Sequence, residues 1–290
     1  MRAAWFDTFG SAKDVLQIGE LDTPSVGAGE VLVRLHTSGV NPSDVKKRAG
    51  SFPNLLDGGH VIPNSDGAGI IEAVGDGIDA TRIGERVWIY QAQYGRRFGT
   101  AAQYVALDSS RAVTLPDNAS FEVGACLGIP AMTSHRAVFA DGEVAGQTIL
   151  ITGGAGRVGY YAIQWASQAG ATVIASASND TDKAVCMSAG AHQVVNHRSD
   201  NVVDEILGAS GGELVDRVVD VEFGANLAFT VEVMKVGGVI ATYSSTQVSE
   251  PTLPFFTMMY KDLTLRTIIV YAMPEAAKEH AIADIHEGLK

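Results

Sequence analysis

The chain has 290 residues, 46% of them hydrophobic, so it can bury more than one core and two domains are expected. Its 33 acidic and 21 basic residues give a formal charge of −12, which argues against nucleic acid and anionic membranes as partners because both repel such a surface. The two cysteines lie far apart without metal-ligand spacing, and no apolar run reaches the length of a secretory signal or a membrane span. A cytoplasmic protein is therefore predicted.

Short β-rich runs separated by glycines dominate the first part of the chain. They are Glu30–His36, Gly67–Val74, Arg86–Ala92 and Ala101–Asp108. Repeated short strands with turn signals predict an all-β, barrel-like domain over residues 1–122. The join to the next domain is expected within the region Pro116–Gly128.

From Gln147 onward the pattern changes to alternating strands and helices. The predicted strands are Thr148–Thr152, Thr172–Ala177, Gln193–Asn196, Asp216–Val221 and Val239–Tyr243, and the predicted helices are Tyr160–Ala169, Asp182–Ala189, Asn201–Leu207 and Leu227–Met234. Alternation of this kind implies right-handed crossovers and a doubly wound parallel sheet. The fold class is therefore α/β, with the second domain spanning residues 123–272.

A glycine-rich turn follows the first of these strands and opens into a helix. Gly153, Gly156 and Gly159 are spaced three residues apart, which allows a tight turn, close backbone approach to a pyrophosphate and close packing of helix on strand. The rest of the expected phosphate-binding turn consists of Ala155, Arg157 and Val158, at the start of the helix, where free amides bind anions. A turn that binds nothing is the alternative, but the strand–turn–helix context favours a dinucleotide.

The segment after the second strand of this domain decides between the two nicotinamide cofactors. An NAD-binding domain usually places an acidic residue here to bind the ribose hydroxyls. This chain instead has Ser176 and Ser178, whose hydroxyls can donate to a 2′-phosphate, with Lys183 close by. NADPH is therefore predicted over NADH, although acidic residues follow directly and Lys183 has the alternative of a solvated helix residue.

Six segments spread over the chain form an ordered set: SGVNPSDVKKRAG (38–50), SDGAGIIEAVGDGI (65–78), GERVW (84–88), GIPAMTSHRAV (128–138), GGAGRVG (153–159) and GAHQVVNHR (190–198). In this order they resemble the zeta-crystallin-like quinone oxidoreductases of the medium-chain dehydrogenase/reductase superfamily. The resemblance implies a GroES-like domain, then a Rossmann domain, with the active site in the cleft between them. It also implies that residues 273–290 begin a return segment to the first domain, and that this segment is truncated.

Mapped by position, the resemblance assigns roles to individual residues. Asn41 matches the family's active-site asparagine. Beyond the glycine turn, the positions expected near the cofactor are Pro42, Lys46, Thr133, His197, Tyr243, Ser244, Ser245, Thr246, Ile269 and Val270. Plainer alternatives exist: Asn41 as a turn residue, Thr133 as a helix-surface hydroxyl and His197 as an exposed loop residue.

The acceptor side departs from the family pattern. Lys46 and Phe52 stand where related enzymes carry tyrosines, so a tyrosyl proton donor is not expected. Lys46 is expected to contact the cofactor or an anionic oxygen, with a solvated helix face as the alternative. The rings of Phe52, Tyr90 and Tyr94 are expected to border the acceptor, although the tyrosines suit a barrel core equally well.

The zinc ligands of the superfamily's alcohol dehydrogenases are not matched. Asn64-Ser65-Asp66 occupies the Gly-His-Glu position, and Asn41 stands where the first cysteine ligand lies. Because zinc requires three or four well-placed ligands, no metal is expected. Without a Lewis acid, hydride transfer to an electron-poor acceptor is favoured over alcohol oxidation.

These observations predict an NADPH-dependent reductase of a quinone or similar conjugated carbonyl. The alternatives are an enone or alkenal reductase and, from another class, a non-catalytic NADPH-binding sensor or structural protein. The apolar, β-branched run Leu263–Tyr271 predicts a further strand at the sheet edge. Pairing of this strand with its equivalent across a two-fold axis would give a homodimer.

Overall fold

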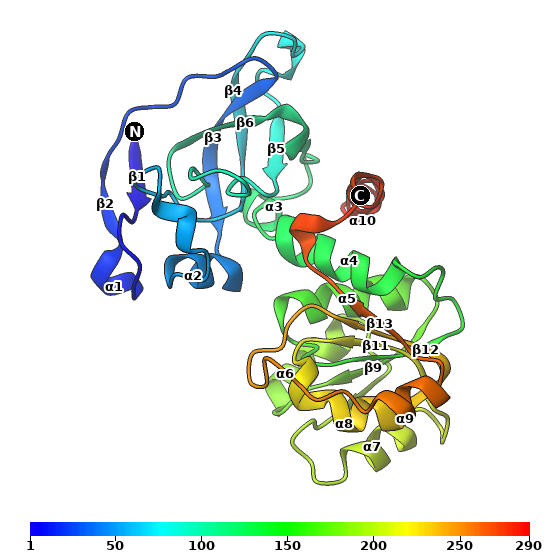
Figure 1. The fold of residues 1–290 in the computed structure, drawn as a ribbon. Coiled ribbons are helices and arrows are strands. Elements are labelled where there is room, and N and C mark those ends of the chain that lie inside the picture. Colours follow the sequence, from blue (N-terminus) through cyan, green and yellow to red (C-terminus); the bar gives the residue numbers. More distant parts are fainter. The chain divides into compact units, whose positions relative to one another are not determined.

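The computed structural model describes all residues 1–290 and divides into two compact units, which Figure 1 traces along the chain. The first unit comprises Met1–Ile129 and Ile282–Lys290, and the second comprises Pro130–Ala281. The division therefore falls a few residues beyond the expected end of the first domain at residue 122. The reason is that the short helix α3 (Phe121–Gly124) packs against the sheet of the first unit.

A five-stranded antiparallel sheet forms the centre of the first unit, in the order β6-β3-β4-β5-β7. Its strands are β3 (Glu30–Gly39), β4 (Asp66–Val74), β5 (Arg86–Ile89), β6 (Tyr104–Asp108) and β7 (Ala112–Thr114). Strand β1 (Arg2–Trp5) pairs with β2 (Gln17–Glu20), and the unit also contains the helices α1 (Ala12–Val15) and α2 (Pro42–Arg48). The sequence predicts β3 to β6. It misses β1, β2 and β7, which are only three or four residues long and carry no clear alternation.

A six-stranded, entirely parallel sheet forms the centre of the second unit, in the order β10-β9-β8-β11-β12-β13. The strands are β8 (Thr148–Ile151), β9 (Thr172–Ser176), β10 (Gln193–Val195), β11 (Val215–Asp220), β12 (Met234–Thr242) and β13 (Thr264–Thr267). The strand order reverses between β8 and β11. Ligands of such sheets bind at the carboxyl ends of the strands beside that reversal.

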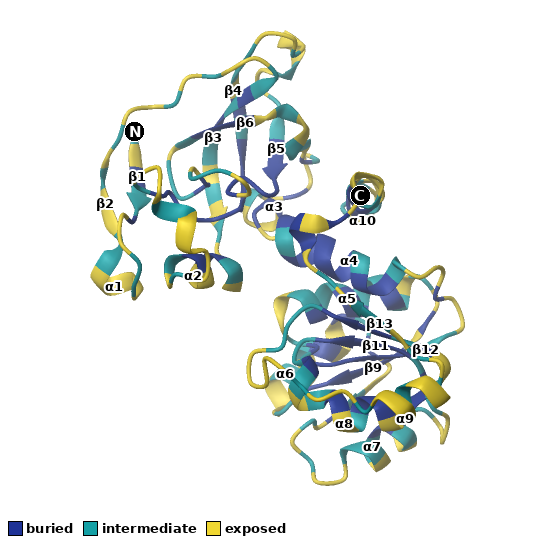
Figure 2. Ribbon diagram, viewed as in Figure 1, coloured by how far each residue is buried: buried dark blue, intermediate teal, exposed yellow.

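Helices cover both faces of this parallel sheet. One apolar cluster contains residues of α4 (Met132–Phe139), α5 (Arg157–Gln168) and α6 (Asp180–Ser188), the other contains residues of α7 (Val202–Ala209), α8 (Phe223–Val233) and α9 (Phe255–Tyr260), and α10 (Glu275–Gly288) ends the chain. Ile149 and Ile151 belong to the first cluster and Leu150 to the second. A strand covered on both faces is expected to be continuously apolar, which explains the sequence of β8. Figure 2 shows these central strands as buried.

The predicted strand Leu263–Tyr271 is wrong in its extent. Strand β13 covers only Thr264–Thr267, and residues Val270–Ala272 form a 3₁₀ turn. The neighbouring strand β12 ends at Thr242, whose carbonyl accepts a last hydrogen bond from the Ile268 amide at 2.8 Å. Beyond that point the chain has no strand to pair with.

No helix combines the length and apolar character needed to cross a membrane.

Candidate active site

Asn41 of the first unit lies in a buried polar cluster. It precedes helix α2 as its N-cap, and its main-chain amide donates to Asp44 Oδ2 at 2.8 Å. Its side-chain Nδ2 donates to Asp66 Oδ2, also at 2.8 Å, and only 4% of Asn41 is exposed. The residue is therefore both a helix cap and the partner of a buried carboxylate, which goes beyond the turn role considered as its alternative.

Asp66, at the start of β4, is fully buried. Burial raises its pKa to about 7, although hydrogen bonds from the Ile129 amide and from Asn41 act in the opposite direction. Its second oxygen, Oδ1, has no hydrogen-bond partner. A Cβ atom at Gly128 would lie 2.2 Å from that oxygen, so only glycine fits there. A carboxyl group with such a pKa can hold or release a proton near neutral pH.

Two further charged residues of α2 share the face that carries Asn41. Asp44 and Lys47 follow at successive spacings of three residues, and both are buried. Burial raises the pKa of Asp44 to about 6, offset in part by its hydrogen bond to Asn41 and by the charge of Lys47. The ammonium of Lys47 donates to the main-chain oxygen of Gln93 at 3.1 Å and to its Oε1 at 3.2 Å.

The predicted acceptor residues separate into two groups. Phe52 and Tyr94 line one cavity of the first unit, together with Lys47. Tyr90 is 5% exposed and packs against Trp88 with ring centroids 5.8 Å apart. It therefore lies in the core of the first unit, which was the alternative to an acceptor contact. Lys46 and Pro42 are exposed on α2, and Lys46 is not among the residues that line this cavity.

The glycine turn of the second unit lies between β8 and α5. Gly153 has φ +61°, and its carbonyl accepts the Gly156 amide at 2.9 Å. A Cβ atom at Gly159 would lie 2.4 Å from the Gly153 oxygen, so the helix and the turn touch too closely for any side chain. Gly156 is the N-cap of α5 and offers no capping side chain to the first-turn amides. These uncapped amides at an exposed turn fit the pyrophosphate of a dinucleotide.

At the carboxyl end of β9 the residues predicted to bind a 2′-phosphate differ in exposure. Ser176 is 3% exposed, and its hydroxyl oxygen accepts the Gly153 amide at 3.1 Å, so it supports the glycine turn from beneath. Ser178 is half-buried and Lys183 is exposed. His197 is half-buried with its Nδ1 unpartnered, and burial lowers its pKa. Lys183 is therefore the residue most open to a ligand here, and Ser178 and His197 are partly accessible.

The remaining predicted cofactor residues of the second unit lie on three segments. After β12, burial raises the pKa of Tyr243, and the hydroxyls of Ser244 and Thr246 lie 3.2 Å apart. Ser245 Oγ instead accepts the Gly224 amide at 2.9 Å. After β13, Ile269 is 56% exposed whereas Val270 is buried, and on α4 Thr133 is 5% exposed and so is not a surface hydroxyl.

Several polar residues of these sites escape prediction from the sequence. The run Lys46-Lys47-Arg48 suggests a solvated face, but Lys47 is buried, and the signal that identifies it is its spacing from Asn41 and Asp44. In the second unit, Thr152 Oγ1 donates to Asp220 Oδ1 at 2.7 Å, which joins the ends of β8 and β11 at the reversal of strand order. Only the pairing of these two strands, which a single sequence does not specify, brings the two residues together.

Two family models match the chain. The one described as "Alcohol dehydrogenase GroES-like domain" matches residues 27–117, and the one described as "Zinc-binding dehydrogenase" matches residues 158–287. Together they cover most of both units. The name of the second refers to a metal, yet positions 41 and 65, where the resemblance places zinc ligands, hold an asparagine and a serine.

Individual proteins are similar to this chain as well. The quinone oxidoreductase of Rattus norvegicus is 33% identical over 242 residues, covering 82% of this chain and 71% of that protein. The quinone oxidoreductase of Homo sapiens is 32% identical over 248 residues, covering 84% of this chain and 73% of that protein. A solved structure of an NAD-dependent alcohol dehydrogenase matches with a TM-score of 0.86 and 27% identity, covering 100% of this chain and 90% of that one.

Proposed function

We propose that this chain, which belongs to the quinone oxidoreductase family of the medium-chain dehydrogenases/reductases and is an oxidoreductase, uses NADPH to reduce a quinone or a similar conjugated carbonyl. The observation that carries the proposal is the glycine turn, because its uncapped helix start and its lack of room for side chains suit a dinucleotide. When bound, the nicotinamide supplies the hydride.

Residues at the end of β9 favour NADPH over NADH. No carboxylate stands among residues 175–179 to bind the ribose hydroxyls of NADH or to repel a 2′-phosphate. Ser178 is half-buried and Lys183 is exposed, so a hydroxyl and a cation are both within the segment that would meet the phosphate. The similarity to an NAD-dependent alcohol dehydrogenase is one of fold, and the NADPH preference depends on the residues of this segment alone.

On the acceptor side, we assign to Asn41 the task of stabilising negative charge on the acceptor oxygen. An amide nitrogen carries two hydrogens, so Asn41 can donate one to Asp66 and direct the other toward the substrate. Asp66 fixes the orientation of that amide. The final proton comes from solvent.

Reduction of enones or alkenals is the second candidate, because it needs the same hydride delivery to an electron-poor carbon. The experiment that separates the two is steady-state oxidation of NADPH with quinones and alkenals compared side by side. We expect the larger kcat/KM for quinones. Reduction of alkenals but not of quinones would make an alkenal the acceptor. Oxidation of alcohols with NADP⁺ as the dominant activity would refute the proposed reductase function.

Homodimerisation and a cytoplasmic location complete the proposal. Strand β13 lies at the end of the sheet order, so one of its edges pairs with β12 and the other has no strand beside it. Such an edge can pair with its equivalent in a second copy. Light scattering that gives twice the mass of one chain is the expected result, and a monomeric mass would contradict the dimer.

A further inference from the structure

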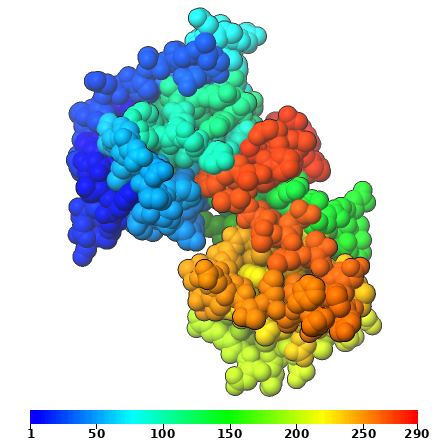
Figure 3. Space-filling model, viewed as in Figure 1, coloured from blue at the N-terminus to red at the C-terminus, as the bar shows by residue number.

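A cavity of about 430 Å³ opens in the first unit beside the Asn41 cluster. Phe52 and Tyr94 supply aromatic surface, and the charged residues that line it are Lys47, Arg96 and Arg97. No aspartate or glutamate lines it. The volume lies in the usual range for small-molecule sites. Figure 3 shows the contributing segments, near residues 50 and 95, at the surface of this unit in blue and cyan.

The charge of this cavity is opposite to that of the protein. The chain carries 33 acidic and 21 basic residues, yet the cavity is bordered by three cationic side chains and no anionic one. A concave, purely cationic surface on an acidic protein concentrates small anions locally. An anionic acceptor gains more from such a lining than a neutral one.

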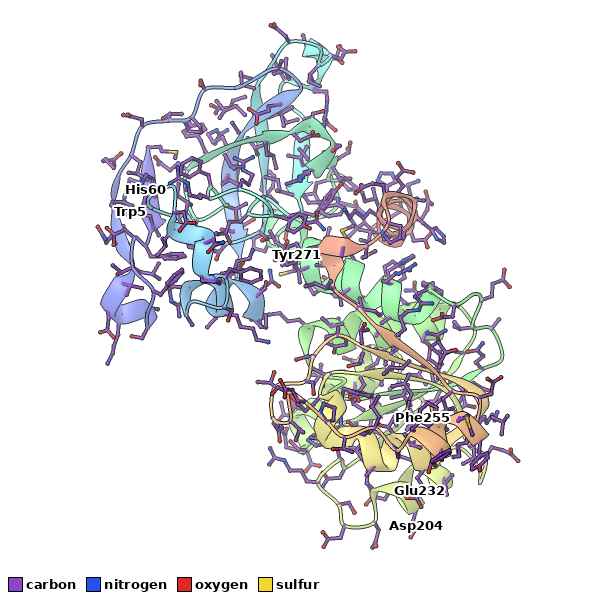
Figure 4. The ribbon with its side chains drawn as sticks, in the orientation of Figure 1. Trp5, His60, Asp204, Glu232, Phe255 and Tyr271 are labelled. Carbon is purple, nitrogen blue, oxygen red and sulfur yellow. The ribbon has the colours of Figure 1, made fainter.

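The guanidinium of Arg97 is held in place by its neighbours. It donates to the main-chain oxygen of His60 at 2.9 Å and lies over the ring of Phe98, 5.0 Å from the centroid. Trp5 and His60, labelled in Figure 4, make an edge-on ring contact with centroids 6.4 Å apart. A Cβ atom at Gly58 would lie 2.7 Å from Arg97 Nε, so glycine leaves the space that the guanidinium fills. The charged group is thus positioned before any ligand arrives.

No carboxylate neutralises this guanidinium. Arg97 has no acidic side chain within ion-pair distance, and of its five N–H donors only one, that to His60, has a partner in the protein. Arg96 donates to the Ala106 oxygen at 2.6 Å and also borders a neighbouring cavity. It therefore contributes positive charge to the lining and not a direct hydrogen bond to the ligand. The ammonium of Lys47 already donates hydrogen bonds to Gln93. Arg97 is therefore the residue placed to bind an anion directly.

We propose that this cavity takes acceptors that carry a carboxylate, with the conjugated ring against Phe52 and Tyr94 and the carboxylate on Arg97. The planar guanidinium matches a carboxylate with two parallel hydrogen bonds. Lys47 adds a second positive charge to the lining, and its ammonium lies 3.4 Å from the hydroxyl oxygen of Ser65, the residue before Asp66, so the cavity adjoins the Asn41 cluster. The inference rests on the proposed reductase function and narrows its substrate class.

The test uses a naphthoquinone with a propionate side chain and its methyl ester, which share a ring but differ in charge. For the wild type we expect kcat/KM for the acid to exceed that for the ester about tenfold, with a smaller ratio at high ionic strength. Arg97→Gln should bring the ratio toward one, and Arg97→Lys should retain part of it. Arg2→Gln removes an exposed charge outside the cavity and should leave the wild-type ratio.

Equal kcat/KM for acid and ester in the wild type would overturn the inference, as would an equal loss of preference in Arg2→Gln and Arg97→Gln. A preference confined to the corresponding phosphate ester would overturn the assignment to a carboxylate. If neither quinone is reduced, the proposed function fails. Equilibrium dialysis of the acid and the ester against the same variants then decides separately whether Arg97 selects the anion.

Discussion

The side-chain amide of Asn41 donates to the carboxyl group of Asp66 at 2.8 Å, and both residues are buried. The Ile129 amide donates to the same oxygen, Oδ2, while Oδ1 has no partner. A proton taken up by Asp66 therefore goes to Oδ1, where it leaves both hydrogen bonds intact. The pair can change its charge near neutral pH without losing the orientation of Asn41.

Replacing Asp66 by asparagine should change how stability depends on pH. Burial raises the pKa of Asp66 to about 7 in the folded protein, so the protonated form favours folding. This contribution is fully present below the pKa of the unfolded chain, about 4, and is lost as pH rises to about 7. The loss is about 4 kcal/mol, from about three pKa units at about 1.4 kcal/mol each.

Urea unfolding from pH 4 to pH 8 measures this effect. Asp66→Asn should lack the part of the pH dependence that the wild type shows in this window, while Asp44, whose pKa is raised to about 6, still titrates in both proteins. Parallel stability curves for the two proteins would show that Asp66 is ionised at all these pH values.

Replacing Asn41 by alanine should reduce catalysis more than cofactor binding. Loss of one hydrogen-bond donor to a developing oxyanion lowers kcat about a hundredfold. The dissociation constant for NADPH, measured by fluorescence titration, should stay near that of the wild type. Asn201→Ala, at the exposed N-cap of α7 where the side chain makes no capping hydrogen bond, is the control. A kcat within twofold of the wild type would remove Asn41 from the mechanism.

The sequence predicts the second unit well because its signals are local. The continuous apolar run of β8, the glycine turn and the start of α5 each report on one segment, and the structure confirms this strand–turn–helix order. The short extent of β13 was not predictable, because it depends on where its neighbour β12 ends at Thr242. Its apolar character alone suggested a longer strand.

The first unit was less predictable where its polar residues are buried. Asn41 was identified through the family resemblance, whereas Lys47 and Asp66 were not expected to join it. Their contacts connect α2 with the start of β4, which lie 18 or more residues apart along the chain. Such contacts follow from tertiary packing, and a charge run in isolation favours the opposite reading of a solvated face.

An acidic side chain in the glycine turn should weaken cofactor binding while leaving the fold in place. In Gly156→Asp, a carboxylate would stand beside the uncapped amides of α5 and repel the pyrophosphate. The φ of −70° at this position is open to any residue, and the added Cβ would lie 3.1 Å from the Gly153 oxygen, which requires a shift of a few tenths of an ångström. We expect NADPH affinity to fall at least about tenfold in calorimetric titration.

The control for this variant is Gly208→Asp, where a side chain would meet open space. It adds the same charge to the second unit away from the turn. A similar loss of NADPH affinity in Gly208→Asp would attribute the effect to net charge, and unchanged affinity in Gly156→Asp would place the phosphates elsewhere.

Removing Lys183 should affect NADPH and NADH differently. If its ammonium binds the 2′-phosphate, Lys183→Ala weakens NADPH binding about fivefold, a modest effect because the residue is exposed, and leaves NADH binding unchanged. Lys13→Ala, at an exposed position of the first unit, should alter neither. Equal effects on both cofactors would show that Lys183 does not contact the 2′-phosphate.

The central claim is that the chain catalyses hydride transfer from NADPH to a conjugated acceptor. The most direct measurement follows NADPH absorbance and hydroquinone formation together, with the wild type and with Gly156→Asp. We expect equimolar consumption of NADPH and quinone by the wild type, and at least about tenfold slower consumption by the variant at an NADPH concentration below the wild-type KM. Binding of NADPH without its oxidation by any quinone or enone would contradict the account and identify a sensor or structural protein.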